Sequence, residues 1–198
     1  MDQSKNNGVE DKILNAALKV VNEETISGTR MHLIAAKAAM GQSNVHYYYK
    51  TKDELMLALQ EKVLQECYEI RAQDVKKCED TLESQLHIFF QQKKYLIVKK
   101  KDYDFAEMDF IIQGKMNRKI HDRFVDSYDQ WREDIREVIV TYCPEITQND
   151  KEMIPYMVVS LLQGASVQAL VDFKDFEVDA YFENCEKMVL SYIKSLKK

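Results

Sequence analysis

Residues that make tight turns are scarce in this chain, and their scarcity limits the folds it can adopt. Five glycines and two prolines occur among 198 residues. Hairpins and phosphate-binding loops depend on glycine, whereas glycine and proline both weaken helices. A hydrophobic share of 45% is sufficient for a packed core. We therefore predict an all-α protein.

Apolar residues recur at helical spacing in the first quarter of the chain. A first helix carries Ile13, Ala17 and Val21, and it is expected to stop near Glu24, where the segment 25–28 breaks the pattern. Two short helices are predicted at about 30–38 and 42–48. The segment 51–54, Thr-Lys-Asp-Glu, has the form of a capping box and begins a long helix.

The same spacing predicts five longer helices in the remaining sequence, joined by short polar segments. They cover about 81–99, 104–113, 116–142, 151–172 and 177–196. Pro155 is expected to kink the helix near residue 151 or to delay its start, because proline lacks a backbone donor.

Charge is distributed unevenly along the chain. The formal net charge is −5, yet residues 1–52 hold seven basic and five acidic side chains, which leaves −7 for the rest. This asymmetry fits a small DNA-facing module on an acidic body.

Cysteine usage and hydropathy point to a reduced, aqueous compartment. Cys67, Cys78, Cys143 and Cys185 include no Cys-x-x-Cys pair and are interpreted as structural thiols. No apolar run approaches the roughly twenty residues that cross a bilayer, and no leader pattern is visible. A soluble, cytoplasmic protein with no membrane partner is expected.

The short segment 42–48 has a polar face that could read DNA. At about 100° per residue, Val45 and Tyr49 share one face and must pack inward. Ser43, Asn44 and Tyr47 then point outward, His46 and Tyr48 lie on the flanks, and Gln42 occupies the exposed N-terminal end. Such amide and hydroxyl groups can hydrogen-bond base edges in a major groove. Alternatively, the tyrosine cluster is an aromatic core patch, an interpretation that we accept for Tyr49.

The stretch from Thr29 to Leu55, TRMHLIAAKAAMGQSNVHYYYKTKDEL, resembles the DNA-binding signature of the TetR family of bacterial repressors. Ile34-Ala35, Ala38, Val45, the tyrosines 47–49 and Thr51 to Leu55 fall in register with it. The helix geometry predicts a helix-turn-helix whose DNA contacts come from Gln42, Ser43, Asn44, His46, Tyr47, Tyr48 and Lys52. The resemblance implies the same contacts and adds Thr29 and Arg30.

Three residues depart from the family pattern. Ala39 stands where the family usually has the turn glycine, Gly41 where it has a Ser or Thr cap, and His46 where it has tyrosine. Ala39 must then accept an unfavourable backbone angle, or the turn must shift by one residue. Because His46 stands in place of a tyrosine, the DNA contacts made at position 46 are left open.

The remainder of the chain is expected to form a second domain. We predict a DNA-binding domain at 1–52 and an effector-binding and dimerisation domain at 53–198. The segment 110–171 is similar to the betaine-regulator branch of the family, which implies a dimer through the last two helices and an effector cavity among the middle ones.

The predicted dimer interface consists of apolar stripes on the last two helices: Val158, Leu161, Leu162, Ala165, Tyr181, Cys185, Met188 and Tyr192. Packing within one chain is the alternative. The predicted cavity residues are aromatic and methionine side chains: Phe89, Phe90, Tyr103, Phe105, Met108, Tyr128, Trp131 and Met157. Taken singly, each of these residues is more often ordinary core, because methionine and aromatic side chains recur at helical spacing in any helical bundle.

Enzymatic and metal-binding patterns are not visible. The glycines are too far apart for a phosphate-binding loop, and the four histidines are scattered. We expect no catalytic residues, no metal and no cofactor.

The leading hypothesis is a ligand-responsive repressor that binds an operator as a homodimer and is released from it by a small-molecule effector. The alternatives are a helical interaction protein that has lost specific DNA binding and, with least support, a helical enzyme.

Overall fold

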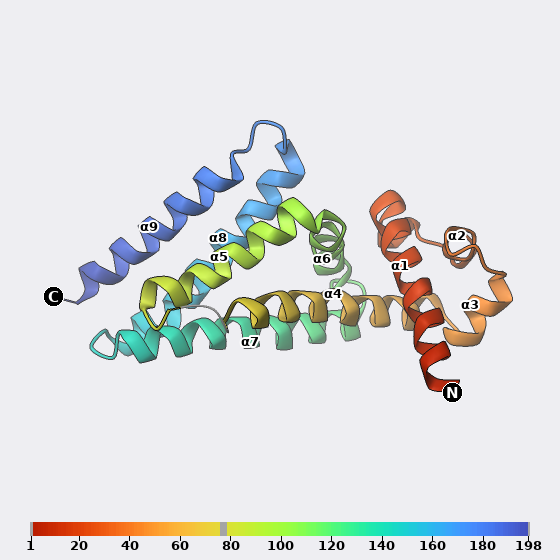
Figure 1. Cartoon of the computed structure of the whole chain (residues 1–198), viewed down its shortest axis with the longest axis horizontal. Helices are drawn as coiled ribbons and strands as arrows, with labels where there is room; N and C mark the ends of the chain where they lie inside the picture. The colour runs from red at the N-terminus through yellow and green to blue at the C-terminus, as the bar shows by residue number, and fades with distance from the viewer. Residues whose placement is uncertain (1, 76–78, 198) are drawn as a thin grey trace. The chain divides into compact units, whose positions relative to one another are not determined.

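The computed structural model describes residues 2–75 and 79–197, so Cys78 lies outside the described residues. Within that part of the chain all regular structure is α-helical, which confirms the predicted fold class (Figure 1). The helices are α1 (Asp2–Gly28), α2 (Met31–Lys37), α3 (Gln42–Tyr48), α4 (Lys52–Val75), α5 (Leu82–Lys99), α6 (Lys101–Gln113), α7 (Arg118–Tyr142), α8 (Gln148–Asp172) and α9 (Val178–Leu196).

The helices pack into two compact units. The first unit contains the described residues of 1–66 and 102–124, and the second contains those of 67–101 and 125–198. These units differ from the predicted division after residue 52, because the first half of α4 and most of α6 pack with α1 to α3. The predicted boundary used local sequence patterns alone, and packing between distant segments does not appear in them.

The first unit is built on a break in α1. Thr25 has φ 60° and ψ 168°, a conformation that only glycine adopts readily, and it interrupts the helix one residue after the predicted end at Glu24. The hydroxyl of Thr29 donates to the carbonyl of Thr25 across 2.7 Å, and its amide donates to the same oxygen at 3.0 Å. These bonds close the turn that leads into α2.

The turn between α2 and α3 is held by two backbone hydrogen bonds. The amide of Met40 donates to Ala35 at 3.0 Å, and that of Ala39 donates to Ala36 at 3.0 Å. This is the Schellman pattern, which requires a left-handed residue at the position of Ala39. Ala39 has φ 49°, so the turn has not shifted and alanine accepts the angle that glycine usually provides.

The long helix α4 begins with the predicted cap. The hydroxyl of Thr51 accepts a hydrogen bond from the Glu54 amide at 3.1 Å. The Glu54 carboxylate reaches back to the amide of Lys50, at 2.8 Å, rather than to Thr51 itself. The cap thereby fixes the backbone that connects α3 to α4.

The second unit has a continuous apolar core from α5, α7, α8 and α9. Phe90 and Phe182 meet edge to face in it, with ring centroids 6.1 Å apart. Thr81 caps α5, because its hydroxyl accepts from the Ser84 amide. Helix α8 begins at Gln148, with Thr147 as its cap, and Pro155 is buried within it. The expected delay at Pro155 was therefore wrong.

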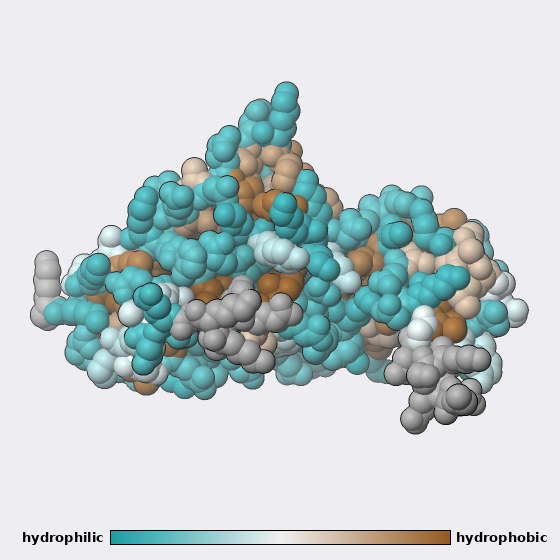
Figure 2. All heavy atoms as spheres, viewed as in Figure 1, coloured by the Kyte–Doolittle hydropathy of each residue, from teal (hydrophilic) through white to brown (hydrophobic). Residues whose placement is uncertain are grey.

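Helix α8 is long and apolar enough to cross a membrane by length and composition alone, although polar residues interrupt its apolar sequence. It is also a core helix of the second unit, since Val158, Leu162 and Ala165 are fully buried against its neighbours. On the face of the molecule drawn in Figure 2, hydrophilic side chains predominate and hydrophobic ones form small patches. Burial of one face in a protein core accounts for the hydropathy of α8.

Candidate DNA-binding surface

Helix α3 presents the polar face that the sequence predicts. Gln42, Ser43, Asn44 and Tyr47 are exposed, whereas Val45 is fully buried. Gly41 precedes the helix in an extended conformation, and its carbonyl accepts from the Asn44 amide at 3.0 Å. The buried valine anchors α3 and leaves its outer face exposed.

The three tyrosines have different environments. Tyr47 is 71% exposed, and its ring packs edge to face on that of Tyr48, with centroids 5.2 Å apart. Tyr49 is half-buried, and burial, followed by the nearby charge of Glu10, raises the pKa of its hydroxyl above 10.0. Tyr49 therefore belongs to the core side, and Tyr47 does not.

Lysine and arginine side chains gather at the starts of α2 and α4. Arg30 donates to the carbonyl of Ser27 at 2.7 Å, and the ammonium of Lys52 lies 3.5 Å from the same oxygen. Burial, and next the positive charge of Arg30, lower the pKa of Lys52. Two cations that share one carbonyl suit a phosphate group, which would relieve their mutual repulsion.

Thr29 does not join this surface. It is fully buried, and its hydroxyl is engaged with Thr25. The predicted DNA contact from Thr29 is therefore corrected: the residue stabilises the turn before α2 and does not reach the solvent.

Helix α6 holds this turn from the other side, within the same unit. The carboxylate of Asp109 accepts from the amide of Ile26, and Gln113 donates to the Ser27 hydroxyl at 2.8 Å. Asn22 donates to the carbonyl of Asp102 at 2.9 Å. These residues could not be predicted from the sequence, because their partners lie about eighty positions away and no local pattern marks them.

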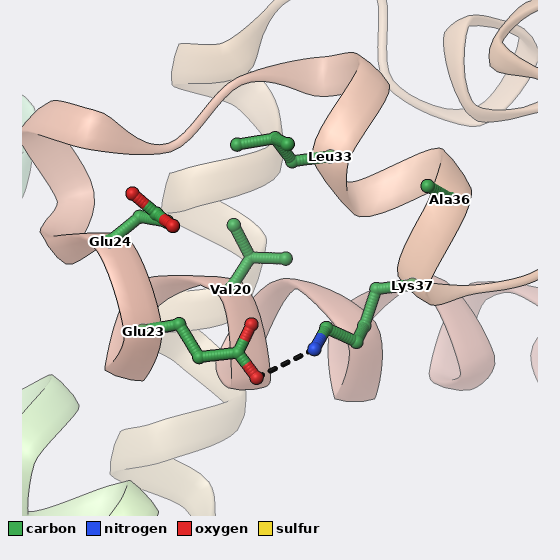
Figure 3. A pocket seen from close by; sticks show the side chains of 6 residues that line it. All are labelled: Val20, Glu23, Glu24, Leu33, Ala36 and Lys37. Carbon is green, nitrogen blue, oxygen red and sulfur yellow. Dashed lines mark hydrogen bonds and ion pairs between the residues drawn. The ribbon is translucent and has the colours of Figure 1, made fainter.

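A pocket of about 400 Å³ lies between α1 and α2 (Figure 3). Val20 and Leu33 form its apolar floor, and an ion pair of 2.6 Å between Glu23 and Lys37 joins the two helices beside it. The Glu23 carboxylate thus balances the charge of Lys37, and the pair fixes α2 against α1.

Comparison with known proteins agrees with this geometry. Residues 13–59 match the family model described as bacterial regulatory proteins of the tetR family. Residues 13–59 are therefore similar to the DNA-binding part of that family. The match includes α2, α3 and the cap of α4, and it confirms the resemblance carried by residues 29–55.

Several relatives share the domain or the fold. A helix-turn-helix transcriptional regulator of uncharacterized role, from the 5′ region of dhlA in Xanthobacter autotrophicus, is 36% identical over 63 residues. That match covers 32% of this chain and 31% of the relative, so it spans about a third of either protein.

Two solved structures have the same fold over nearly the whole chain. A candidate transcriptional regulator from Saccharomonospora viridis, solved in complex with choline, has a TM-score of 0.83 at 17% identity and covers 92% of this chain and 96% of its own. A TetR transcription regulator from Haloarcula marismortui has a TM-score of 0.79 at 19% identity, with coverages of 96% and 98%. At these identities the likeness concerns the fold.

The predicted cavity residues are divided between the two units. Tyr103, Phe105 and Met108 are half-buried in the first. In the second, Phe89 and Phe90 belong to the core, Met157 is 42% exposed, and the rings of Tyr128 and Trp131 meet edge to face at 5.8 Å. Phe90 is fully buried against Phe182, which makes it a core residue.

The predicted dimer residues also divide into two groups. Val158, Leu162, Ala165 and Cys185 lie in the core of the second unit, so these four predictions are corrected. Leu161 and Tyr181 are half-buried, and the Tyr181 hydroxyl donates to the Leu161 carbonyl at 2.9 Å. Met188 and Tyr192 are 53% and 37% exposed and remain available to a partner.

Among the residues whose placement is described, no three His, Cys, Asp or Glu side chains gather as a metal site would require. His87 pairs with Glu186 of α9 at 3.0 Å, not with Glu83 one turn away.

Proposed function

We propose that the protein is a repressor that binds a two-fold operator as a homodimer, and that a small-molecule effector releases it. One observation carries the DNA-binding part: Gln42, Asn44 and Tyr47 are exposed together on a helix whose opposite face is anchored by Val45. Hydrogen-bonding groups on the outer face of a short helix can read base edges, and the Arg30 and Lys52 cations can hold phosphates.

An apolar face of α8 supports the dimer. Its exposed members are Met153, Tyr156, Met157, Val167, Leu170 and Val171. The exposed Met188 and Tyr192 of α9 border this face, since the Tyr192 hydroxyl lies 3.5 Å from Asp150 of α8. A contiguous apolar surface of this kind favours association, and a two-fold operator calls for two recognition helices.

Two replacements test the dimer. Leu170→Glu places a charge on the α8 face and should convert dimers to monomers in analytical ultracentrifugation, because a carboxylate is costly to bury without a partner. Ile112→Glu is the control, as Ile112 is exposed on α6. A wild-type chain that sediments as a monomer at operator-binding concentrations would contradict the proposal.

We further propose that the chain belongs to the betaine-regulator branch and responds to a small quaternary ammonium compound. The similarity of segment 110–171 and the choline bound to the Saccharomonospora viridis structure support this choice. Aromatic rings such as Tyr128 and Trp131 attract such cations through their faces. Trp131 also has a buried indole N–H without an acceptor in the described part of the chain.

DNA binding is tested with duplexes that flank the protein's own gene, by fluorescence anisotropy at several salt concentrations. Specific binding should weaken steeply with salt, because phosphate contacts release counterions. Asn44→Ala should reduce the affinity for the specific duplex by roughly tenfold or more, the range of one base-reading side chain. Asn15→Ala is the matched control, since Asn15 is exposed on α1 and bonds Asp11.

The same assay decides between the functions. Weak binding that is indifferent to sequence would support a helical interaction protein instead of a repressor. Choline and glycine betaine are then added to the preformed complex. Release by either one supports the proposed branch, whereas specific binding unaffected by both leaves the repressor and rejects this effector class.

A further inference from the structure

The imidazole of His46 lies between two polar groups of the same turn region. Its Nε2 atom is 3.4 Å from the Gln42 side-chain nitrogen, one helical turn before it. Its Nδ1 atom is 3.3 Å from the backbone carbonyl oxygen of Lys50, which follows α3. Both distances are at the long end for hydrogen bonds, so each interaction contributes only a small free energy.

The two partners require the same tautomer of His46. A backbone carbonyl can only accept, so Nδ1 must carry the proton and donate to Lys50. The nitrogen of the Gln42 amide can only donate, so Nε2 must be the unprotonated acceptor. A neutral imidazole protonated on Nδ1 satisfies both neighbours at once.

The position of the Lys50 carbonyl is itself fixed by the cap of α4. The Lys50 amide donates to the Glu54 carboxylate at 2.8 Å, and the Glu54 amide donates to Thr51 at 3.1 Å. The ring of His46 is therefore attached to a part of the backbone that the helix cap holds in place. The ring in turn fixes which end of the Gln42 amide faces outward.

This orientation determines what Gln42 presents to DNA. With one N–H directed at His46, the amide leaves its carbonyl oxygen and its second N–H exposed. One acceptor beside one donor is the pair that binds adenine through its N6 and N7 atoms. If the amide were turned over, its oxygen would face His46 and two donors would point outward.

We propose that His46 is a positioning residue that orients the Gln42 amide for base reading, and that it sets the base preference at the operator position facing Gln42. The inference rests on the proposed function, since it assumes that α3 enters a major groove. It assigns position 46 a role distinct from the phosphate or base contact that sequence analysis considered there.

The tautomer is measured on the free protein, so this test does not require an operator. Nitrogen-15 NMR of the imidazole at neutral pH should show His46 protonated on Nδ1. Gln42→Ala should leave that tautomer in place, because the Lys50 carbonyl sets it. A ring protonated on Nε2, or on both nitrogens, would overturn the proposal even if the protein represses as proposed.

The base preference is measured by anisotropy on duplexes that vary one base pair at a time. His46→Phe keeps the ring and removes both nitrogens. We expect discrimination at the pair facing Gln42 to fall roughly two- to tenfold, the range of one modest hydrogen bond. Preferences at the pairs facing Ser43 and Asn44 should stay unchanged, and so should the thermal midpoint.

The double variant separates positioning from direct contact. Gln42→Ala removes the reader, so adding His46→Phe to it should cause no further loss at that pair. Additive losses, or an equal loss at every base pair, would mean that His46 contacts DNA itself and would overturn the proposal. If His46→Phe fails to fold, His46→Leu replaces it, because leucine also lacks hydrogen-bonding groups, and the same outcomes decide.

Discussion

The carboxylate of Asp109 in α6 accepts a hydrogen bond from the backbone amide of Ile26, the first residue after the break in α1. Amides that follow a helix break lack the usual partner one turn earlier. Ile26 is only 4% exposed, so water could not readily replace the carboxylate. Asp109 thus supplies the acceptor for this buried amide. Loss of the carboxylate would leave the turn before α2 unsupported.

Asp109→Ala should destabilise the protein by about 1–3 kcal/mol, because it leaves a buried donor without a partner. The free energy of unfolding is measured by urea denaturation. Asp109→Asn keeps an acceptor oxygen, so its free energy of unfolding should fall less than that of Asp109→Ala. Equal losses in the two variants would show that the charge of Asp109, not its hydrogen bond, supports the turn.

Thr25→Gly should stabilise the protein by about 1 kcal/mol. Threonine at φ 60° and ψ 168° is strained, and glycine adopts these angles freely, although it gains entropy when unfolded. Thr25→Val, which keeps the branched side chain, should give no such gain. Thermal denaturation followed by circular dichroism compares the three proteins, and a lower midpoint for the glycine variant would contradict the assignment of strain.

Two identical replacements three residues apart should have opposite effects. Ala39→Gly should stabilise the protein by about 0.5–1 kcal/mol, because Ala39 has φ 49°. Ala36→Gly should destabilise it by a similar amount, since Ala36 is an exposed residue within α2. Urea denaturation of both variants is the measurement. Changes of the same sign would show that the turn at Ala39 does not have the left-handed conformation.

Much of the first unit could be predicted from local sequence, because helical spacing and helix caps are local patterns. Helical spacing identified the buried face of Val45, and the Thr51 cap identified the start of α4. The burial of Thr29 could not be predicted, because it depends on how the break at Thr25 turns the chain. The bond between Asp109 and Ile26 joins residues far apart in sequence, and periodicity contains no information about such pairs.

The same limit explains why four of the predicted dimer residues lie in the core of the second unit. Helix α8 is apolar on nearly all sides, so sequence could not decide which stripe faces its own chain. Packing selected Val158, Leu162 and Ala165 for the core, and it left Val167 and Leu170 exposed. Hydrophobicity alone does not distinguish a core stripe from an interface stripe.

Tyr47→Ala should weaken operator binding by roughly tenfold while the thermal midpoint stays nearly unchanged, because the side chain is 71% exposed. Tyr49→Ala should instead cost about 2 kcal/mol of folding free energy, since that ring is half-buried. Anisotropy and thermal denaturation are measured on both variants. Collapse of the Tyr47 variant would place its side chain in the core and reverse the assigned faces.

The stability of the second unit should fall at high pH because of Tyr181. Burial, and next its hydrogen bond with Cys185, raise the pKa of this hydroxyl to about 12 from 10.0. The folded state therefore holds the proton more tightly than the unfolded state does. The resulting stabilisation is complete below pH 10 and is lost as the pH rises towards 12.

Tyr181→Phe isolates this contribution. Below pH 10 the variant should be less stable by about 1 kcal/mol, because it lacks the hydrogen bond to the Leu161 carbonyl. The difference from wild type should shrink above pH 10, as the tyrosine of the unfolded chain ionises. Urea denaturation across this range is repeated with Cys185→Ala in both proteins, which removes the titration of the neighbouring thiol. Parallel curves at every pH would show that Tyr181 ionises as readily in the folded protein as in the unfolded chain.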